Sequence, residues 1–335
     1  MIAFLPACIP SSQREVSRSD FVLGTACSIR LVGGSEKLLD EIFARLRQIE
    51  DELSVNKPGS RIDALNAAAG LVPVVVGPDA LAIVKRDLDL SAWSDGAFDP
   101  SVGPLVKLWG IGISRENYAS PPTPAEIAAA KRFVGWKDIV LDEAKGTVFL
   151  KRKGMALDLG ATSKGFAADE VAKLIRAEGV NSAVIDLGGN VLVMGLRPDG
   201  QPWRIGLQNP FSGKDRRGDY LGIASLSSKT MVTSGVYERY FIDRATGKRY
   251  HHILDTKTGY PVDNGLMSVT IVTPKSFDAD GFTTTIFALG REKGMALAKT
   301  KGVDVIVVDA NKKVYLSPGV SAYFEITDPS FLFAE

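Results

Sequence analysis

Apolar residues recur at helical spacing in several parts of this chain. The clearest case follows Ser35, which can cap the helix, and stops before Lys57-Pro58-Gly59-Ser60; its apolar positions are Leu38, Leu39, Ile42, Phe43, Leu46 and Ile49. The same reasoning predicts helices over residues 61–68, 79–94, 125–133, 164–178, 282–289 and 292–300. Helices are therefore expected along the whole length of the chain.

Shorter apolar or alternating runs predict strands between these helices, over residues 21–32, 139–141, 147–150, 184–186, 268–273 and 305–308. Residues 203–250 are also expected to be rich in strands, and residues 95–112 to form a structured loop. Many strand pairs are joined too closely for a crossover helix. The predicted fold class is α+β, with largely antiparallel mixed sheets and flanking helices.

The first residues of the chain differ from the rest. Leu5-Pro6-Ala7-Cys8 followed by a polar stretch resembles the lipidation site of a bacterial lipoprotein, although only seven residues precede Cys8. We expect residues 1–19 to be a signal remnant and tether with a lipid anchor at Cys8, and residues 20–335 to form one domain. The alternative is an incidental cysteine in a frayed tail.

Composition narrows the choice of function. The chain has 335 residues and is 45% hydrophobic, which is ample for a large buried core. Its 40 basic and 39 acidic residues give a net charge of +1, so no global basic field indicates nucleic acid as a partner. Two cysteines exclude a disulfide framework, and Cys27 is expected to be buried. No apolar run is long enough to span a bilayer.

The two histidines, His251 and His252, are adjacent. On a strand their side chains would point to opposite faces, so at most one of them is expected to act as a base in any single site. The alternative is a polar strand end with two incidental histidines.

Asp280 and Thr284 are four residues apart, so on a helix they would share a face. One carboxylate and one hydroxyl suit a hard cation such as Mg²⁺, which keeps several waters and binds phosphate oxygens. The alternative is an ordinary helix start, where Asp is a favoured cap.

Two glycine turns are further candidates for ligand contact. Asp158-Leu159-Gly160-Ala161-Thr162-Ser163-Lys164 enters a helix with a lysine in its first turn, an arrangement that can hold a diphosphate although the P-loop spacing is absent. Asp186-Leu187-Gly188-Gly189-Asn190 ends a strand where a ligand could approach the backbone. The alternatives are a plain capped helix and a plain hairpin turn.

These four segments, in this order, resemble the ApbE family of FMN transferases. The resemblance extends to Leu23-Gly24-Thr25, to residues 96–105 with Trp109-Gly110, and to residues 233–241, so that it covers about residues 20–325. It implies a T-fold-related architecture and a Mg²⁺-dependent enzyme that transfers FMN from FAD to a threonine of an acceptor protein, releasing AMP. It also implies a location on the periplasmic side of the bacterial inner membrane.

The resemblance carries over to individual positions. It implies that Mg²⁺ binds the Ala161 carbonyl, Asp280 and Thr284, with Thr283 close by, and that His252 is the base. The positions implied to contact FAD are Leu23, Asn56, Ala97, Phe98, Asp99, Asp158, Lys164 and Ile253. The acceptor, a flavoprotein or membrane redox subunit, is expected in trans.

One departure from the family pattern leaves an alternative open. Many family members have an aromatic residue where this chain has Asn56, and an aromatic ring there would stack on the flavin. The alternative function is therefore a Mg²⁺-dependent FAD pyrophosphatase that hydrolyses FAD to FMN and AMP, alone or together with transfer. A flavin-binding lipoprotein without activity and a solute-binding lipoprotein of another class are two further alternatives.

Overall fold

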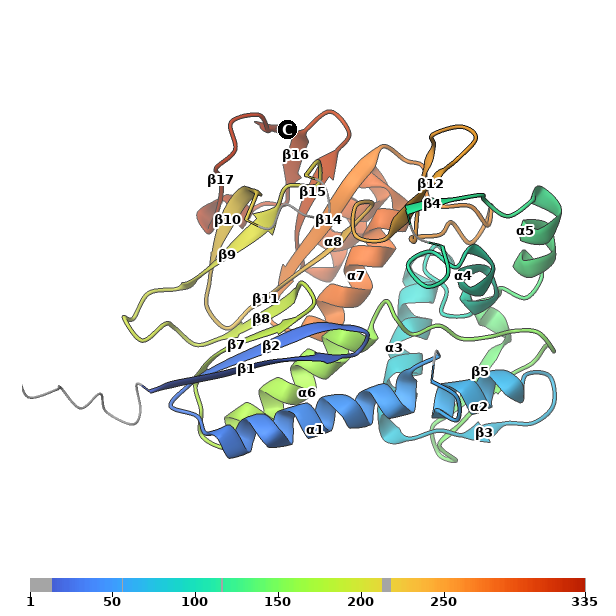
Figure 1. The fold of residues 1–335 in the computed structure, drawn as a ribbon, viewed down its shortest axis with the longest axis horizontal. Coiled ribbons are helices and arrows are strands. Elements are labelled where there is room, and N and C mark those ends of the chain that lie inside the picture. Colours follow the sequence, from blue (N-terminus) through green and yellow to red (C-terminus); the bar gives the residue numbers. More distant parts are fainter. Residues whose placement is uncertain (1–13, 56, 116, 213–217, 335) are drawn as a thin grey trace, which may run out of the picture.

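The computed structural model describes residues 14–55, 57–115, 117–212 and 218–334 (Figure 1). Cys8 and Asn56 lie outside these residues. The helices are α1 (Glu36–Leu53), α2 (Arg61–Ala67), α3 (Pro78–Trp93), α4 (Gly103–Trp109), α5 (Pro124–Lys131), α6 (Ser163–Ala177), α7 (Ser276–Leu289) and α8 (Arg291–Lys301).

The central element is a nine-stranded sheet in the order β1-β2-β7-β8-β11-β14-β15-β16-β18. All neighbouring strands in it are antiparallel except β16 and β18. Its strands are β1 (Glu15–Val22), β2 (Thr25–Val32), β7 (Ser182–Leu187), β8 (Asn190–Met194), β11 (Thr230–Gly235), β14 (Leu266–Thr273), β15 (Asp304–Asp309), β16 (Lys313–Leu316) and β18 (Leu332–Phe333). The predicted α+β class with largely antiparallel sheets is confirmed.

Three small sheets surround the large one. They are formed by β17 (Phe324–Ile326), β10 (Tyr220–Leu226) and β9 (Trp203–Gln208); by β13 (Arg249–His251), β12 (Tyr240–Asp243) and β4 (Asn117–Ala119); and by β3 (Val74–Val75), β6 (Thr147–Leu150) and β5 (Ile139–Asp142). The first packs on one face of the large sheet through a shared apolar cluster that includes Leu207, Leu221 and Ile306.

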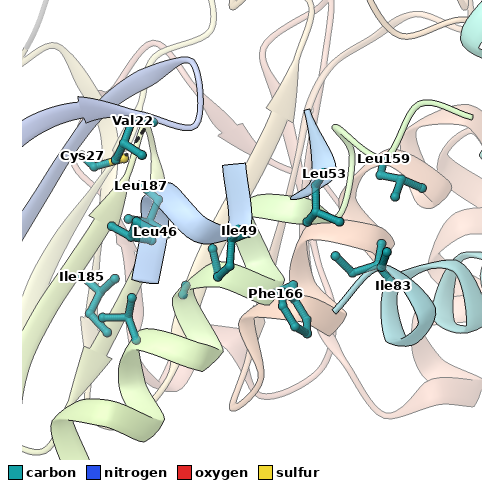
Figure 2. Packing of buried hydrophobic residues seen from close by; sticks show 14 of the residues in the cluster. Val22, Cys27, Leu46, Ile49, Leu53, Ile83, Leu159, Phe166, Ile185 and Leu187 are labelled. Carbon is teal, nitrogen blue, oxygen red and sulfur yellow. Dashed lines mark hydrogen bonds between the residues drawn. The ribbon is translucent and has the colours of Figure 1, made fainter. Parts of the chain in front are cut away.

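Helices α1, α6, α7 and α8 cover the other face of the large sheet (Figure 1). Figure 2 shows part of the core that results: Leu46 and Ile49 of α1 lie beside Ile185 and Leu187 of β7, with Phe166 of α6 nearby. Burying each such side chain contributes about 1.5–3 kcal/mol. This packing fixes α6, and with it the loop that leads into α6.

Two predicted boundaries near the N-terminus are wrong. The chain forms a hairpin rather than one strand over residues 21–32, because Leu23 and Gly24 turn with φ of 57° and 68°. Strand β1 begins at Glu15, inside the segment expected to be a tether, since its backbone pairs with β2 along its whole length. The turn sequence Leu-Gly lacks the Asn or Asp that usually marks such a hairpin.

Two further predictions concern single segments. The expected loop over residues 95–112 contains helix α4, so that part of the prediction is wrong. Cys27 is fully buried as expected, and its Sγ donates to the carbonyl of Val22 at 3.3 Å. Among the described residues, no helix is both long and apolar enough to cross a bilayer.

Candidate active site

The site is built on a close crossing of α6 and α7. Gly165 makes the crossing possible, because a Cβ atom there would lie 2.3 Å from the carbonyl oxygen of Ser276 and 2.7 Å from the Cβ of Asp280. The backbone N–H of Gly165 donates a hydrogen bond to Asp280 Oδ2 at 2.8 Å. The first turn of α6 thereby orients the carboxylate of α7.

Asp280 is a buried acid with several polar neighbours. Its residue is 4% exposed, and burial raises the pKa of its carboxyl group, while Lys164, the Gly165 N–H and the amide of Asn190 oppose that shift. Lys164 Nζ lies 3.9 Å from Asp280 Oδ1. Among the described residues, none accepts a hydrogen bond from the buried Nδ2 of Asn190. Asp280 thus has only partial compensation for its burial, as expected of a ligand that meets a cation.

Thr283 and Thr284 differ in how free their hydroxyl groups are to bind a metal ion. The buried hydroxyl of Thr283 donates to the Asp280 carbonyl at 2.7 Å and accepts from Ser234 Oγ at 2.9 Å. Thr284 is half-buried, and its hydroxyl lies 3.5 Å from Ser234 Oγ. Thr284 is therefore the freer hydroxyl ligand, and it lies on the same face of α7 as Asp280.

The loop before α6 brings Ala161 to α7. A Cβ atom on Gly281 would lie 3.3 Å from Cγ2 of Thr162, so the two segments touch beside Asp280. Thr162 Oγ1 donates to the buried Asp87 of α3 at 3.3 Å, which ties the loop to a third helix. In the described part of the chain, no group donates a hydrogen bond to the carbonyl of Ala161. That carbonyl is available to a ligand.

The donor atoms suit a magnesium ion that also binds phosphate oxygens of a substrate. They are one carboxylate (Asp280), one hydroxyl (Thr284) and one carbonyl (Ala161), all of them oxygen. Among the residues that the structure describes, no group of three or more His, Cys, Asp or Glu side chains could hold a metal. A site with so few protein ligands fits Mg²⁺, which commonly takes its remaining ligands from water and substrate phosphates.

The adjacent histidines have different environments, as their alternation predicts. His251, the last residue of β13, is buried; its Nε2 lies 2.8 Å from the Val262 carbonyl and its ring packs edge-on against Phe287. His252 is half-buried, and its Nδ1 lies 3.3 Å from the Arg239 carbonyl. Burial, then the charge of Arg239, lowers the pKa of His252 to about 3. His252 is therefore neutral at physiological pH.

Charged groups gather around His252 and Asp280. Desolvation of the Glu238 carboxylate by the surrounding protein raises its pKa to about 7. The positive charges of Lys164 and Arg239 act in the opposite direction. Burial also raises the pKa of Asp158, and the same two cations oppose that shift. Lys164, Arg239, Asp158 and Glu238 thus form one electrostatic group; Lys164 lies near Asp280, and the charge of Arg239 acts on His252.

The segment 97–99 borders the same region. Asp158 N donates to the Pro100 carbonyl at 2.8 Å, and Thr256 Oγ1 donates to the Gly96 carbonyl at 2.6 Å, so this segment lies between the α6 loop and the histidine loop. Ala97 lines a cavity of about 340 Å³ that extends to Ala288, one helical turn beyond Thr284 on α7. The sequence-predicted residues of these segments are therefore neighbours.

Some residues that are predicted to contact FAD pack against, or form hydrogen bonds with, other parts of the protein. Phe98 and Ile253 are buried in one apolar cluster, 5% and 4% exposed. Asp99 accepts hydrogen bonds from Ser101 N, Ser101 Oγ and Trp136 N, which occupy both carboxylate oxygens. Leu23 lies in the β1–β2 turn and packs against the other large cluster. Their roles in binding FAD stay predictions, as does that of Asn56, which lies outside the described residues.

Four residues that the structure places at the site, Asn190, Ser234, Glu238 and Arg239, belong to segments noted in the sequence, but none of them is individually predicted as a site residue. Asn190 and Ser234 lie at strand ends, and their role depends on the strand order β8-β11-β14, which no local pattern shows. Glu238 and Arg239 belong to the segment 233–241, but a Glu-Arg pair in a turn is by itself an ordinary surface sequence.

Known proteins resemble this chain in both sequence and structure. A model of the ApbE family matches residues 23–307. The chain is 38% identical to a FAD:protein FMN transferase of Klebsiella pneumoniae, covering 96% of this chain and 98% of that protein, and 37% identical to one of Treponema pallidum, covering 95% and 91%. It is also similar in structure to the flavin transferase ApbE from Vibrio cholerae, with a TM-score of 0.82, 29% identity, and 92% and 99% of the two chains covered. The chain belongs to the ApbE family.

Proposed function

We propose that this protein is an FAD:protein FMN transferase, which moves FMN from FAD to a threonine of an acceptor protein and releases AMP. The observation that carries the proposal is the group of Asp280, Thr284 and the Ala161 carbonyl beside Lys164, in a chain whose relatives bear this name. FAD contains a diphosphate, and the cleaved bond lies within it. The site offers oxygen ligands for a metal and cations for the phosphates.

Asp280, Thr284 and the Ala161 carbonyl would hold Mg²⁺. When bound, Mg²⁺ supplies positive charge that stabilises the phosphoryl oxygens and the departing AMP. Lys164 and Arg239 add charge that does not depend on the metal, and the N–H of Gly165 orients Asp280. The cavity lined by Ala97 and Ala288 would receive part of the FAD.

His252 is the proposed base. A threonine hydroxyl is a poor nucleophile, and a neutral imidazole can accept its proton as the oxygen attacks the FMN phosphorus. Its low pKa keeps His252 unprotonated, and the contact with the Arg239 carbonyl holds the ring in place. The bound diphosphate is expected to raise that pKa, because a nearby negative charge favours the imidazolium.

FAD hydrolysis is the second candidate function, and the observation that favours it is Asn56 in place of an aromatic residue. Without a stacked ring, water would have a route to the phosphorus. We expect Asn56→Tyr to retain flavin more tightly and to release FMN and AMP more slowly in the absence of an acceptor, as measured by chromatography. A variant that cleaves FAD as fast as the wild type would contradict this interpretation.

The test of the main proposal uses FAD, Mg²⁺ and a threonine-bearing acceptor protein. Covalently flavinylated acceptor, followed by mass and fluorescence, should form in the wild type and not with EDTA. Asp280→Asn should abolish it. Asp278→Asn, on the same helix as Asp280, should retain it, because Asp278 pairs with Arg86 of α3 at 2.8 Å. If Asp280→Asn retained Mg²⁺-dependent transfer, the site would be wrong.

We also propose that the protein is a lipoprotein, anchored through Cys8 on the periplasmic side of the inner membrane. The support is the sequence around Cys8 alone. Labelled fatty acid should be incorporated into the wild type and not into Cys8→Ala when the gene is expressed with its own start. Equal labelling of the two would contradict the anchor.

A further inference from the structure

The small sheet of β3, β6 and β5 carries an unusually apolar outer surface. Leu71, Val72 and Val75, in and just before β3, are 68%, 56% and 63% exposed. Val140 of β5 is 41% exposed, and Phe133, just after α5, is 36% exposed. Scattered exposed apolar residues are ordinary, but five in neighbouring segments form a patch.

Backbone pairing and close contacts establish that these segments adjoin. Strand pairing places Val75 opposite Thr147 and Val140 opposite Phe149, so both valines share the outer face with β6. Gly70 N donates to the Leu150 carbonyl at 2.8 Å, which brings residues 71 and 72 beside the end of β6. A Cβ on Gly154 would lie 2.7 Å from the ring of Phe133, which brings residue 133 to the same end.

Basic residues are interleaved with this patch. Arg132, Lys137, Lys151 and Lys153 are all exposed, and the backbone of Lys153 packs directly against Gly70. None of the four forms a salt bridge within the described chain. By contrast, the acidic residues of the same sheet are paired: Asp138 with Arg152 at 2.7 Å, Asp142 with Lys145 at 3.0 Å and Glu143 with Lys85 at 2.8 Å.

We propose that this patch, formed by Leu71, Val72, Val75, Phe133, Val140 and the four basic residues, binds the surface of an anionic phospholipid bilayer. The apolar side chains suit the acyl boundary of such a bilayer. The flanking basic groups, which form no salt bridge within the described chain, suit its negative headgroups. The binding needs no lipid on Cys8 and no flavin. It is therefore independent of the proposed enzymatic activity.

The patch also lies away from the start of the described chain. Figure 1 shows α2, β3 and β5 together at one end of the molecule, whereas β1 begins near the opposite end. A lipid at the N-terminus alone would leave the domain free to turn about its tether. A second contact at the opposite end would restrict that rotation, which makes the patch useful to a tethered protein.

The test is co-sedimentation of the full chain carrying Cys8→Ser with vesicles of phosphatidylglycerol and phosphatidylcholine in equal amounts, or of phosphatidylcholine alone. Binding is expected to the anionic vesicles only and to weaken with added salt. The double variant Lys151→Glu/Lys153→Glu should lose roughly tenfold or more in affinity. Leu71→Ser/Val72→Ser should also bind more weakly at unchanged charge.

Matched controls keep the test specific. Lys299→Glu/Lys313→Glu changes the net charge equally, at exposed positions of α8 and β16. Leu332→Ser/Phe333→Ser removes apolar residues of similar exposure, 63% and 60%, from β18. Both controls should bind as the wild type does. No vesicle binding, equal binding to both vesicle types, or equal losses in patch and control variants would each overturn the proposal, and the first would leave an acidic protein as the partner to seek.

Discussion

The two adjacent histidines lie in different surroundings, and we expect their roles to differ accordingly. His251 is held in the interior by the Val262 carbonyl and the ring of Phe287, while His252 borders the charged group of Lys164 and Arg239. The alternation of a strand separates them, so His251 packs in the core while His252 is left for the proposed role as a base.

We therefore expect opposite phenotypes from the two alanine variants. His252→Ala should lose most FMN transfer while its thermal midpoint changes little, because the ring is half-buried with one weak contact. His251→Ala should lower the free energy of unfolding by about 2–4 kcal/mol, as expected for a buried ring, and retain transfer at a temperature where it is folded. Transfer rates and thermal melts together check this, and equal loss of transfer in both would mean that His252 is not the base.

Glu238 provides a prediction about pH. Its pKa of about 7 means that the side chain is largely neutral at pH 6 and negative at pH 8. A negative carboxylate near Lys164 and Arg239 competes with the FAD diphosphate for the same cations. In EDTA, the affinity for FAD should fall roughly fivefold from pH 6 to pH 8, as for one charge contact of about 1 kcal/mol.

Glu238→Gln is the control for that measurement, since it keeps the shape and removes the titration. Its affinity for FAD, followed by quenching of flavin fluorescence, should vary little between pH 6 and pH 8. A variant with the same pH dependence as the wild type would assign the titration to another group.

At the scale of elements, the crossing of α6 and α7 is the feature on which Asp280 depends. Gly165→Ala would insert a methyl group 2.3 Å from the Ser276 carbonyl and 2.7 Å from the Asp280 Cβ, so the helices must separate. We expect a loss of about 1–3 kcal/mol in the free energy of unfolding and a loss of FAD cleavage.

Gly294→Ala is the matched comparison. A Cβ there would lie 2.5 Å from Ile286 Cγ2, between α7 and α8 and away from Asp280. Denaturant unfolding should show a similar loss of stability, yet FAD cleavage should continue. If both variants keep full activity, the crossing does not position Asp280.

The length and local pattern of each element decide how well it could be predicted from sequence. Helix α1 was clear because its apolar positions repeat over many turns and Ser35 caps it, with Oγ accepting from Leu38 N. Helix α4 was not, because it is short, begins Gly103-Pro104 and lies in a glycine-rich segment. Asp280 and Thr284 could be paired from spacing alone. Ser234 and Asn190 could not, since strand order decides which residues meet them.

The stability of the whole molecule depends on strands near the C-terminal end of the described chain. Strand β15 lies between β14 and β16 inside the large sheet, and Val305 and Val307 belong to the cluster that also holds Phe282 and Phe287 of α7. A chain that ends after residue 302 would leave β14 as an apolar edge and α7 without part of its support.

We expect that truncated chain to lack cooperative unfolding and to bind no FAD, as measured by circular dichroism and flavin fluorescence. A chain that ends after Phe331 is the control, because Leu332 and Phe333 are mostly exposed and form only the outermost strand. It should unfold cooperatively and bind FAD. Flavin binding by the shorter chain would contradict the dependence on β15.

The order of the strands has a consequence for biosynthesis. Asp158 and Lys164 leave the ribosome long before Asp280, and α7 is supported by β15, which follows it in the chain. Because domains generally fold as units during synthesis, a nascent chain has no complete nucleotide site until almost all of it has emerged. We therefore expect a nascent chain that has not yet exposed β15 to lack a complete site and to bind no flavin.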